Sequence, residues 1–568
     1  MSRNKECSLS VFVNFINNPL LSLFGLILSL ALIAIPSARA ATAKLVGPHK
    51  SSHKLCTSGD KYCVTSIFSF ISNLNFGSFP SSGVMALPNG AYILPVAGYD
   101  GSPYGTGSIG VVAALYPQEN DSWQEVLLGT FAPDGAAPSV SLANANPTSA
   151  GYSFDGGTIY GGACGLGGIY QVTAPATLDG NVIFTNLYNN FSDSNTKYYS
   201  GNPSPAGGNP NVCGYDSDNT AYLGGSNPAG VLPQTDGTTL VSTQGGGKFA
   251  SGTLSHLTTD NAQVIDFVFQ QDNLDEFNGF APYGPLVQVG PDTVYGVTLD
   301  DSVNQTGTLY KATRSGGKWS VSLAYNFPPL NGAMGLNGQM PIGLSLGDDG
   351  NIYVATFSGG LWAGGTIGRY IPPTDKTEGK YEKLLDMGKN PNDLCFPLGA
   401  PLAIKDKATG NLYIFFTGSN GGDLNTNDDV GSGGVAALTK LETSVPLWNF
   451  TNGADGAYPT GPMFFQNGAA IITNPGGGVD GYGAVVSVPL TMDDSTVFHE
   501  PNTAEVALAK LVTPTLAGSS LSPKLTHKGA QYDPRLPSRL NPKNILKRLL
   551  LQRTLQKTLS EWTQESSN

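Results

Sequence analysis

The chain has 568 residues, of which 73 are glycine and 39 are proline, while only 13% are charged. Apolar residues make up 40% of the chain and aromatic residues 10%, which excludes an intrinsically disordered protein. The formal net charge of −12 argues against nucleic-acid binding by the main body, and the composition is typical of many short strands joined by turns.

The N-terminal segment has the order of a secretory signal. Basic residues precede an apolar run over residues 20–35, and a small-residue pattern ending at Ala40 follows. This order predicts a signal peptide over residues 1–40, cleaved near Ala40, and hence a secreted or periplasmic bacterial protein. An uncleaved membrane anchor is the alternative, because the apolar run is long for a signal. Residues 41–63 are expected to be a linker.

The cysteines suit an exported protein. Cys56 and Cys63 are close enough in sequence for a small disulfide loop, which an oxidising compartment permits. Cys164, Cys213 and Cys395 also remain after signal cleavage, and their pairing stays open because three thiols cannot all pair among themselves. The sequence has no Cys-x-x-Cys pair and no Cys/His quartet, so we expect no zinc site.

Residues 64–503 contain a repeated strand pattern. Each copy has an apolar run, a tight turn, a second run, a glycine-rich loop and two further runs, all rich in β-branched and aromatic residues. Seven copies start near residues 83, 140, 229, 284, 341, 399 and 461, with residues 192–226 inserted. Such a pattern predicts an all-β fold, a β-propeller of seven four-stranded antiparallel blades, because stacking around an axis buries both faces of each sheet.

One run at the start of this region lacks the rest of its copy. The segment "TSIFSF", from Thr65 to Phe70, resembles the fourth runs "LAYNF" and "PLWNF". We expect it to complete the last blade, whose own fourth strand at Thr496 to Phe498 is short. Such strand exchange would close the ring.

Several copies resemble a known repeat family. The phrases "DGNIYVATFSGG", "TGNLYIFFTGSNGG" and "DTVYGVTLDD" are similar to the GloVer repeats of exported bacterial proteins, which follow "GDGNLYGTT…GGGTVFKLT…LYSF". The resemblance is strongest from about residue 280 to residue 490 and weaker from residue 83 to residue 269. It implies an exported, propeller-like protein, and it carries over no activity and no catalytic residue.

Two patterns suggest enzymes, but neither fits the predicted fold. Ser345 in "GLSLG" matches Gly-x-Ser-x-Gly, yet it falls inside an expected strand with no helix pattern after it. The glycine-rich loops "GGACGLGG" and "QGGGKFASG" lack the Lys-Ser/Thr ending of a phosphate-binding loop. We therefore interpret Ser345 as a strand residue and these glycines as loop residues.

The loops between second and third strands should share one face of a propeller. They carry aromatic rings beside carboxylates, a combination that suits a sugar, because rings stack on its apolar face and acids accept its hydroxyl hydrogen bonds. Paired acids would alternatively permit the chemistry of a glycosidase or polysaccharide lyase. A structural surface protein, whose acids only keep the rim soluble, is the third interpretation. The candidate ligand-binding residues are Asp100, Tyr104, Asp300, Asp301, Trp362, Asp480 and Tyr482.

One acidic loop has partial calcium-binding character. In "DLNTNDDVG", Asp423, Asn425 and Asn427 occupy alternate positions, and Asp429 follows. Oxygen ligands in this arrangement can converge on Ca²⁺, although residue 434 is glycine where an EF-hand loop would have glutamate. Calcium at these four residues is the one cofactor considered, and a solvated acidic loop is the alternative.

The C-terminal segment, residues 504–568, differs from the repeats. Nine basic residues and one acidic residue lie between Lys524 and Lys557. Residues 541–563 predict an amphipathic helix that could contact a membrane or an envelope polymer, or else pack on the acidic propeller. Taken together, the sequence favours a monomeric, exported β-propeller that binds a carbohydrate or a protein at its rim loops, without nucleic-acid binding by the propeller.

Overall fold

The structure is a computed structural model, and its description covers most of the repeat region. The described residues are 45–57, 62–71, 78–98, 110–130, 137–138, 146–148, 151–159, 167–178, 180–188, 225–247, 249, 251–270, 279–301, 306–328, 335–390, 392–422 and 431–500. The predicted signal peptide, the C-terminal helix and nearly all of the insertion lie outside these residues. The described ranges contain no helix long and apolar enough to cross a bilayer.

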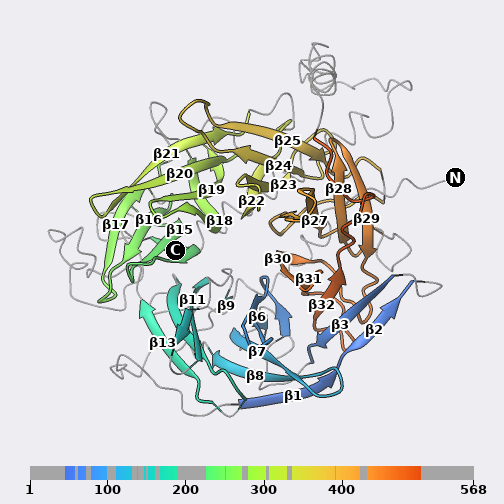
Figure 1. Ribbon diagram of the computed structural model, residues 1–568. Helices are drawn as coiled ribbons and strands as arrows, with labels where there is room; N and C mark the ends of the chain where they lie inside the picture. The colour runs from blue at the N-terminus through green and yellow to red at the C-terminus, as the bar shows by residue number, and fades with distance from the viewer. Residues whose placement is uncertain are drawn as a thin grey trace, which may run out of the picture.

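Seven antiparallel sheets surround a common axis (Figure 1). The described residues form strands and no helix, which confirms the predicted seven-bladed β-propeller. Blades are numbered here from the first sheet after the N-terminal segment. In blades 2 to 6 the chain runs from an inner strand at the axis to an outer strand at the perimeter (Figure 1).

The first three blades contain the following strands. Blade 1 has β4 (Ser78–Pro80), β5 (Met85–Ala86), β6 (Tyr92–Gly98), β7 (Val111–Gln118) and β8 (Ser122–Thr130). Blade 2 has β9 (Ala137–Pro138), β10 (Asn146–Thr148), β11 (Gly151–Ile159), β12 (Gly168–Ala174) and β13 (Ile183–Tyr188). Blade 3 has β14 (Ser226–Pro233), β15 (Thr239–Gly245), β16 (Thr253–Leu257) and β17 (Gln263–Val268).

The remaining blades follow the same order. Blade 4 has β18 (Gly279–Gly290), β19 (Thr293–Asp301), β20 (Thr308–Ser315) and β21 (Lys318–Asn326). Blade 5 has β22 (Gln339–Leu346), β23 (Ile352–Ser358), β24 (Thr366–Ile371) and β25 (Lys380–Asp386). Blade 6 has β26 (Leu402–Lys405), β27 (Leu412–Gly418), β28 (Gly434–Lys440) and β29 (Thr443–Asn449). Blade 7 has β30 (Thr460–Gln466), β31 (Ala469–Asn474), β32 (Ala484–Pro489), β3 (Cys63–Ser69) and β2 (His53–Cys56).

The hydrophobic core consists of layers between neighbouring blades. Tyr353 and Ile367 of blade 5, for example, pack in one buried cluster with Ile414 and Leu438 of blade 6. Each sheet has apolar side chains on both faces, so only a neighbour on either side removes them from water. This explains why short runs of Val, Ile, Leu, Tyr and Phe, none long enough for an independent core, recur along the chain.

The ring closes by strand exchange, as the sequence predicted. β3 pairs antiparallel with β32, with Thr65 opposite Ser487 and Ser69 opposite Ala484, and it takes the fourth place in blade 7. The prediction that Thr496 to Phe498 supply a fourth strand of blade 7 was wrong. Because β3 occupies that place, the segment crosses to blade 6, where Phe498 N donates to Leu412 O.

The N-terminal segment, expected to be a linker, adds two outer strands. β1 (Leu45–Ser51) pairs with β8 on the edge of blade 1, and β2 pairs with β3 on the edge of blade 7. We call residues 45–56 the N-terminal strap, because they cross the seam between the first and last blades. The predicted Cys56–Cys63 disulfide links β2 to β3, and Cys395 is disulfide-bonded as well.

Candidate functional site

Each described inner strand except that of blade 2 begins with the same short phrase. A residue with left-handed backbone precedes a proline, and a glycine follows two or three residues later. The left-handed residues have φ between 52° and 62° and are called junction residues here. They are Phe79, Asn227, Ala281, Met340, Phe396 and Tyr458.

The junction residues connect neighbouring blades by hydrogen bonds. In five of them, the backbone N–H donates to a carbonyl in the loop between the second and third strands of the preceding blade. These bonds are Phe79 N to Tyr482 O (2.9 Å), Ala281 N to Ser251 O (2.9 Å), Met340 N to Thr306 O (3.0 Å), Phe396 N to Gly364 O (2.7 Å) and Tyr458 N to Ser432 O (2.9 Å). The face of the ring that contains these loops is called the junction face.

Glycine and proline make this close approach possible. Gly365 follows the carbonyl that Phe396 N contacts and has φ +92°. A Cβ at Gly365 would lie 2.4 Å from Thr356 O and 2.9 Å from Pro397 Cδ. Nearer the axis, a Cβ at Gly399 would lie 2.0 Å from Gly461 O of the next inner strand. The abundant glycine of this chain therefore serves blade-to-blade contact at these positions.

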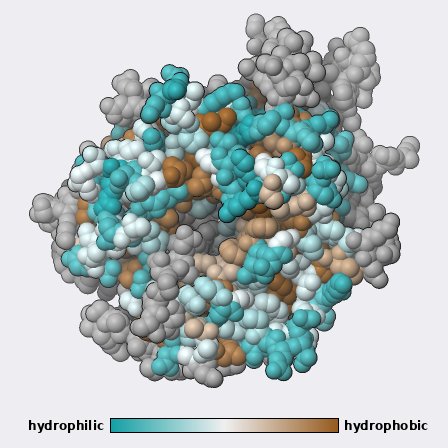
Figure 2. Space-filling view, in the orientation of Figure 1, coloured by the Kyte–Doolittle hydropathy of each residue, from teal (hydrophilic) through white to brown (hydrophobic). Residues whose placement is uncertain are grey.

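The junction residues themselves are not glycine, although glycine would relieve their backbone strain. A left-handed conformation costs a residue with a Cβ roughly 1–2 kcal/mol, and the following proline restricts the backbone further. Met340 and Phe396 pack with Leu299 and Phe357 in one apolar cluster. Phe79, Ala281 and Tyr458 are only half-buried. Figure 2 shows one face of the ring, hollowed near the axis, with apolar residues beside the hollow.

The two acids predicted at the end of β19 have different environments. Asp301 is fully buried and accepts a hydrogen bond from the Thr306 hydroxyl (3.2 Å). Asp300 is half-buried, lies opposite Phe280 on β18, and accepts a hydrogen bond from Asp301 N (2.8 Å). Burial, with a smaller contribution from the neighbouring Asp301 carboxylate, raises the pKa of Asp300 to about 7 despite that hydrogen bond.

The other described candidates lie in different parts of the junction face. Trp362 is half-buried in the loop between β23 and β24, where Leu361 N donates to Asp386 Oδ1 (2.9 Å). Asp480 accepts an ion-pair hydrogen bond from Lys50 Nζ of the N-terminal strap (2.8 Å). Tyr482 makes an edge-on ring contact with Phe79 across the same seam, with ring centroids 5.8 Å apart.

The five described candidates therefore lie at three places on the ring: two in blade 4, one in blade 5 and two at the seam of blades 7 and 1. Asp100 and Tyr104 lie outside the described residues, as do the calcium candidates Asp423, Asn425, Asn427 and Asp429. Within the described part of the chain, no group of three or more His, Cys, Asp or Glu side chains is arranged to hold a metal ion.

Ser345 lies inside β22, as expected of a strand residue. Its hydroxyl donates to Pro401 O of blade 6, so its hydrogen bond links two blades. This contact gives the serine a role in the fold.

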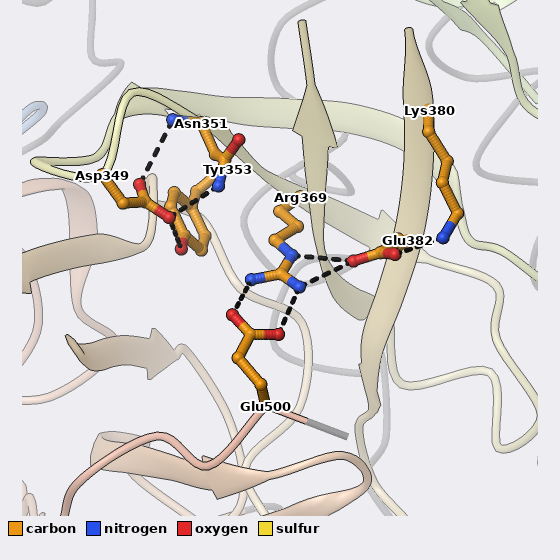
Figure 3. A network of polar contacts seen from close by, with 7 residues as sticks. All are labelled: Asp349, Asn351, Tyr353, Arg369, Lys380, Glu382 and Glu500. Atoms are coloured by element: carbon orange, nitrogen blue, oxygen red, sulfur yellow. Dashed lines mark hydrogen bonds and ion pairs between the residues drawn. The ribbon is translucent and has the colours of Figure 1, made fainter. Parts of the chain in front are cut away.

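A polar network around the buried Arg369, away from the axis, also belongs to the fold (Figure 3). Arg369 on β24 donates from Nη1 and Nη2 to Glu500 (2.5 and 2.6 Å) and from Nε to Glu382 (2.8 Å). All three of its nitrogens are therefore engaged by carboxylates of the same chain. The network anchors the segment before Glu500 on blade 5 and is not arranged to receive a ligand.

The predicted strand pattern does not include the junction residues. The phrases "NPAG", "APYG", "MPIG", "FPLG" and "YPTG" recur at residues 227, 281, 340, 396 and 458 and are a usable signal. Because the predicted copies follow the apolar runs, most of their starts fall at or beside the glycine that ends the phrase, and the junction residue lies before the start.

Comparisons with known proteins reveal fold likeness only. No protein-family model and no curated protein matches the sequence. Similar solved structures include PorZ, a surface component of the type-IX secretion system of Porphyromonas gingivalis, at 12% identity, covering 75% of this chain and 49% of that one, with a TM-score of 0.40. Another is a Trypanosoma rangeli sialidase, at 9% identity, covering 82% and 62%, with a TM-score of 0.35. A third is an aldose sugar dehydrogenase from Streptomyces coelicolor, at 15% identity, covering 49% and 80%, with a TM-score of 0.29. At these identities and TM-scores, none of them assigns a ligand or a reaction to this chain.

Proposed function

We propose that this chain is an exported binding protein that holds its ligand, most simply a carbohydrate, at the junction face. The observation that carries the proposal is that the three half-buried junction residues, Phe79, Ala281 and Tyr458, keep side chains at left-handed positions. Glycine is available throughout this chain and occupies neighbouring positive-φ positions. Retaining Phe, Ala and Tyr against backbone strain, at positions that are not buried in the core, indicates that these side chains have a use.

The junctions combine a constant frame with variable side chains. Proline, glycine and the interblade hydrogen bond recur from blade to blade, while the half-buried junction residue changes from Phe79 to Ala281 to Tyr458. A rigid scaffold that presents different side chains around one opening is the usual arrangement of a binding surface. Half-buried aromatic rings such as Phe79 and Tyr458 suit the apolar faces of sugar rings.

The contacts of the described acids favour a binder over a hydrolase. Glycoside hydrolysis needs two carboxyl groups that face one substrate at a spacing of roughly 5–10 Å. Asp301 is instead buried against Thr306, and Asp480 is paired with Lys50. These two carboxylates therefore have partners within the fold, which leaves Asp300 as the candidate acid of blade 4 that could meet a ligand.

The disulfides support the exported location. The Cys56–Cys63 bond lies at the end of a hairpin on the perimeter of the ring, where Cys56 is exposed. Disulfides persist in oxidising compartments such as the periplasm or the cell exterior. The predicted signal peptide would deliver the chain there.

The test separates binding from stability at a single junction residue. The full chain and its Tyr458→Gly variant are compared on a glycan array and by thermal unfolding. Tyr458→Gly removes the ring but suits the left-handed backbone, so we expect the melting temperature to change by less than about 2 °C. Binding of the recognised glycan should weaken by roughly tenfold.

A matched control comes from the opposite end of the same blade. Asn467, in the turn between β30 and β31, is exposed and also left-handed, with φ 51°. Asn467→Gly should leave both binding and stability unchanged. If Tyr458→Gly lowers the melting temperature by several degrees while glycan binding persists, the ring of Tyr458 serves packing and the proposal fails.

A further inference from the structure

One carboxylate on the junction face is not required by the fold that surrounds it. In three blades, a threonine near the end of the second strand donates its hydroxyl to the carbonyl two residues later. These bonds are Thr243 to Gly245 O (3.1 Å), Thr298 to Asp300 O (3.0 Å) and Thr356 to Ser358 O (3.1 Å). The same backbone geometry therefore forms with Gly, Asp or Ser at this position, and blade 4 alone of the three has an acid there.

One oxygen of the Asp300 carboxylate accepts a hydrogen bond, and the other accepts none from the part of the chain that the structure describes. One oxygen, Oδ1, accepts the hydrogen bond from Asp301 N (2.8 Å), and the main chain is fixed through Thr298. Among the hydrogen bonds of the described residues, Oδ2 takes part in none. Oδ2 is not among the buried polar atoms that lack a partner, so it reaches solvent, and a hydrogen-bond donor of a ligand could replace water there.

Aromatic residues lie beside this carboxylate. Phe280 is directly opposite Asp300 in the β18–β19 pair. The next residue, Ala281, donates its N–H to Ser251 O, which brings the loop that contains Phe249 against the same strand. The Phe249 side chain is 42% exposed, so the loop that is hydrogen-bonded to β18 presents an aromatic ring to solvent.

We propose that Asp300, with Phe280 and Phe249, forms a subsite for a sugar that has a free ammonium group. An ammonium group donates hydrogen bonds to a carboxylate and is attracted to aromatic faces, whereas a neutral hydroxyl or acetamido group lacks the charge. Burial raises the pKa of Asp300 to about 7, so a nearby cation would restore its ionised form. This inference rests on the proposed carbohydrate binding and names the substituent that the subsite selects.

The test compares two oligosaccharides that differ only in N-acetylation, which removes the charge of each amino group. Calorimetry near neutral pH measures binding of a β-1,4-linked glucosamine hexamer and of the N-acetylglucosamine hexamer to the full chain. The glucosamine hexamer should bind more tightly than the acetylated one. Asp300→Ser should weaken the glucosamine hexamer by about tenfold, the loss of one charge-assisted contact, and leave the acetylated hexamer unchanged.

Two variants separate an effect on binding from an effect on folding. Asp300→Ser copies the residue that blade 5 has at Ser358, so its melting temperature should match the wild type. Asp292→Ser alters an exposed acid in the turn between β18 and β19 of the same blade and should change neither affinity nor stability. A large drop in the melting temperature of Asp300→Ser would show that the acid is structural and would overturn the proposal.

The remaining outcomes distinguish this inference from the proposed function. If both hexamers bind equally and Tyr458→Gly weakens them, the junction face binds carbohydrate and the ammonium subsite is wrong. If a lysine hexapeptide binds as tightly as the glucosamine hexamer and Asp300→Ser weakens both equally, the subsite selects basic peptides and the sugar assignment is wrong. If neither hexamer binds, both proposals fail for these glycans.

Discussion

Near the axis, the junction between the last and first blades is built like the junctions inside the ring. Phe79 N donates to Tyr482 O across the seam, just as Met340 N donates to Thr306 O between blades 4 and 5. At the perimeter the seam is different, because β1, β2 and β3 cover it and Lys50 pairs with Asp480. Extra strands at the perimeter thus hold the seam together, while the junction near the axis has the same hydrogen bond as the other junctions.

The contacts that stabilise the ring and the side chains that can bind a ligand therefore lie in different parts of the molecule. The perimeter contacts of the seam occur once and close the ring, so their loss should unfold the propeller or loosen it. The junctions near the axis have a constant backbone frame with variable side chains. Changes to the frame should lower stability, whereas changes to the side chains should weaken ligand binding and leave stability nearly unchanged.

The largest effect should follow loss of the seam strands. A chain that lacks residues 45–69 has only three strands in blade 7, and the apolar residues that β32 shares with β3 become exposed. We expect no cooperative thermal transition by circular dichroism. A chain that lacks only residues 45–51 loses β1 from the edge of blade 1 and should still unfold cooperatively, at a lower temperature. Wild-type melting of the longer deletion would contradict the role of β3 in ring closure.

The next effect concerns the junction frame. Gly365→Ala places a Cβ 2.4 Å from Thr356 O at φ +92°, so the blade 5–blade 6 junction must open. We expect a loss of roughly 3 kcal/mol in the free energy of unfolding, measured by denaturant titration. Gly350→Ala, at φ +81° with nothing within 4 Å, should cost only about 1 kcal/mol. Equal losses would mean that backbone strain alone, without blade contact, determines the effect.

A smaller effect depends on pH and on a buried acid of blade 1. Glu125 on β8 is 1% exposed, and its Oε1 has no hydrogen-bond partner among the described residues. Burial raises the pKa of Glu125 from 4.5 to about 8, although the charge of Lys50 lowers it in part. The folded chain therefore keeps a proton that the unfolded chain loses. This contribution makes the free energy of unfolding fall as pH rises from about 4.5 to about 8.

Glu125→Gln should remove this pH dependence. Thermal unfolding should show equal melting temperatures near pH 4.5 and a variant more stable by roughly 3 °C at pH 8. Glu119→Gln changes an exposed acid on the hairpin before β8 and provides the control. A Glu125→Gln variant that is less stable than the wild type at pH 8 would show that the ionised carboxylate is needed.

The sequence predicted the repeating architecture better than the termini. Four-run copies with glycine-rich loops indicated seven blades, and "TSIFSF" indicated β3 because it resembles other fourth strands. The N-terminal strap resembles no copy, so no pattern in its residues predicted β1 or β2. Thr496 to Phe498 were placed in blade 7 by proximity in sequence, whereas hydrogen bonding to Leu412 places them in blade 6.

The candidate site was predicted only in outline. The sequence could assign loops to a common face, but the partner of Asp480 is Lys50, 430 residues away, and no local pattern specifies such a contact. The separate roles of Asp300 and Asp301 depend on burial that neighbouring strands impose. The GloVer resemblance, the calcium ligands at Asp423 to Asp429 and the C-terminal helix stay predictions.

The most direct test of the account replaces three junction side chains at once. A variant with Phe79→Gly, Ala281→Gly and Tyr458→Gly keeps the proline–glycine frame and the interblade hydrogen bonds but presents no side chain at those positions. Thermal unfolding and glycan binding are measured on the same preparation of the full chain. The account predicts a melting temperature within a few degrees of the wild type and complete loss of glycan binding. A variant that binds glycan as the wild type does but melts far earlier would contradict it.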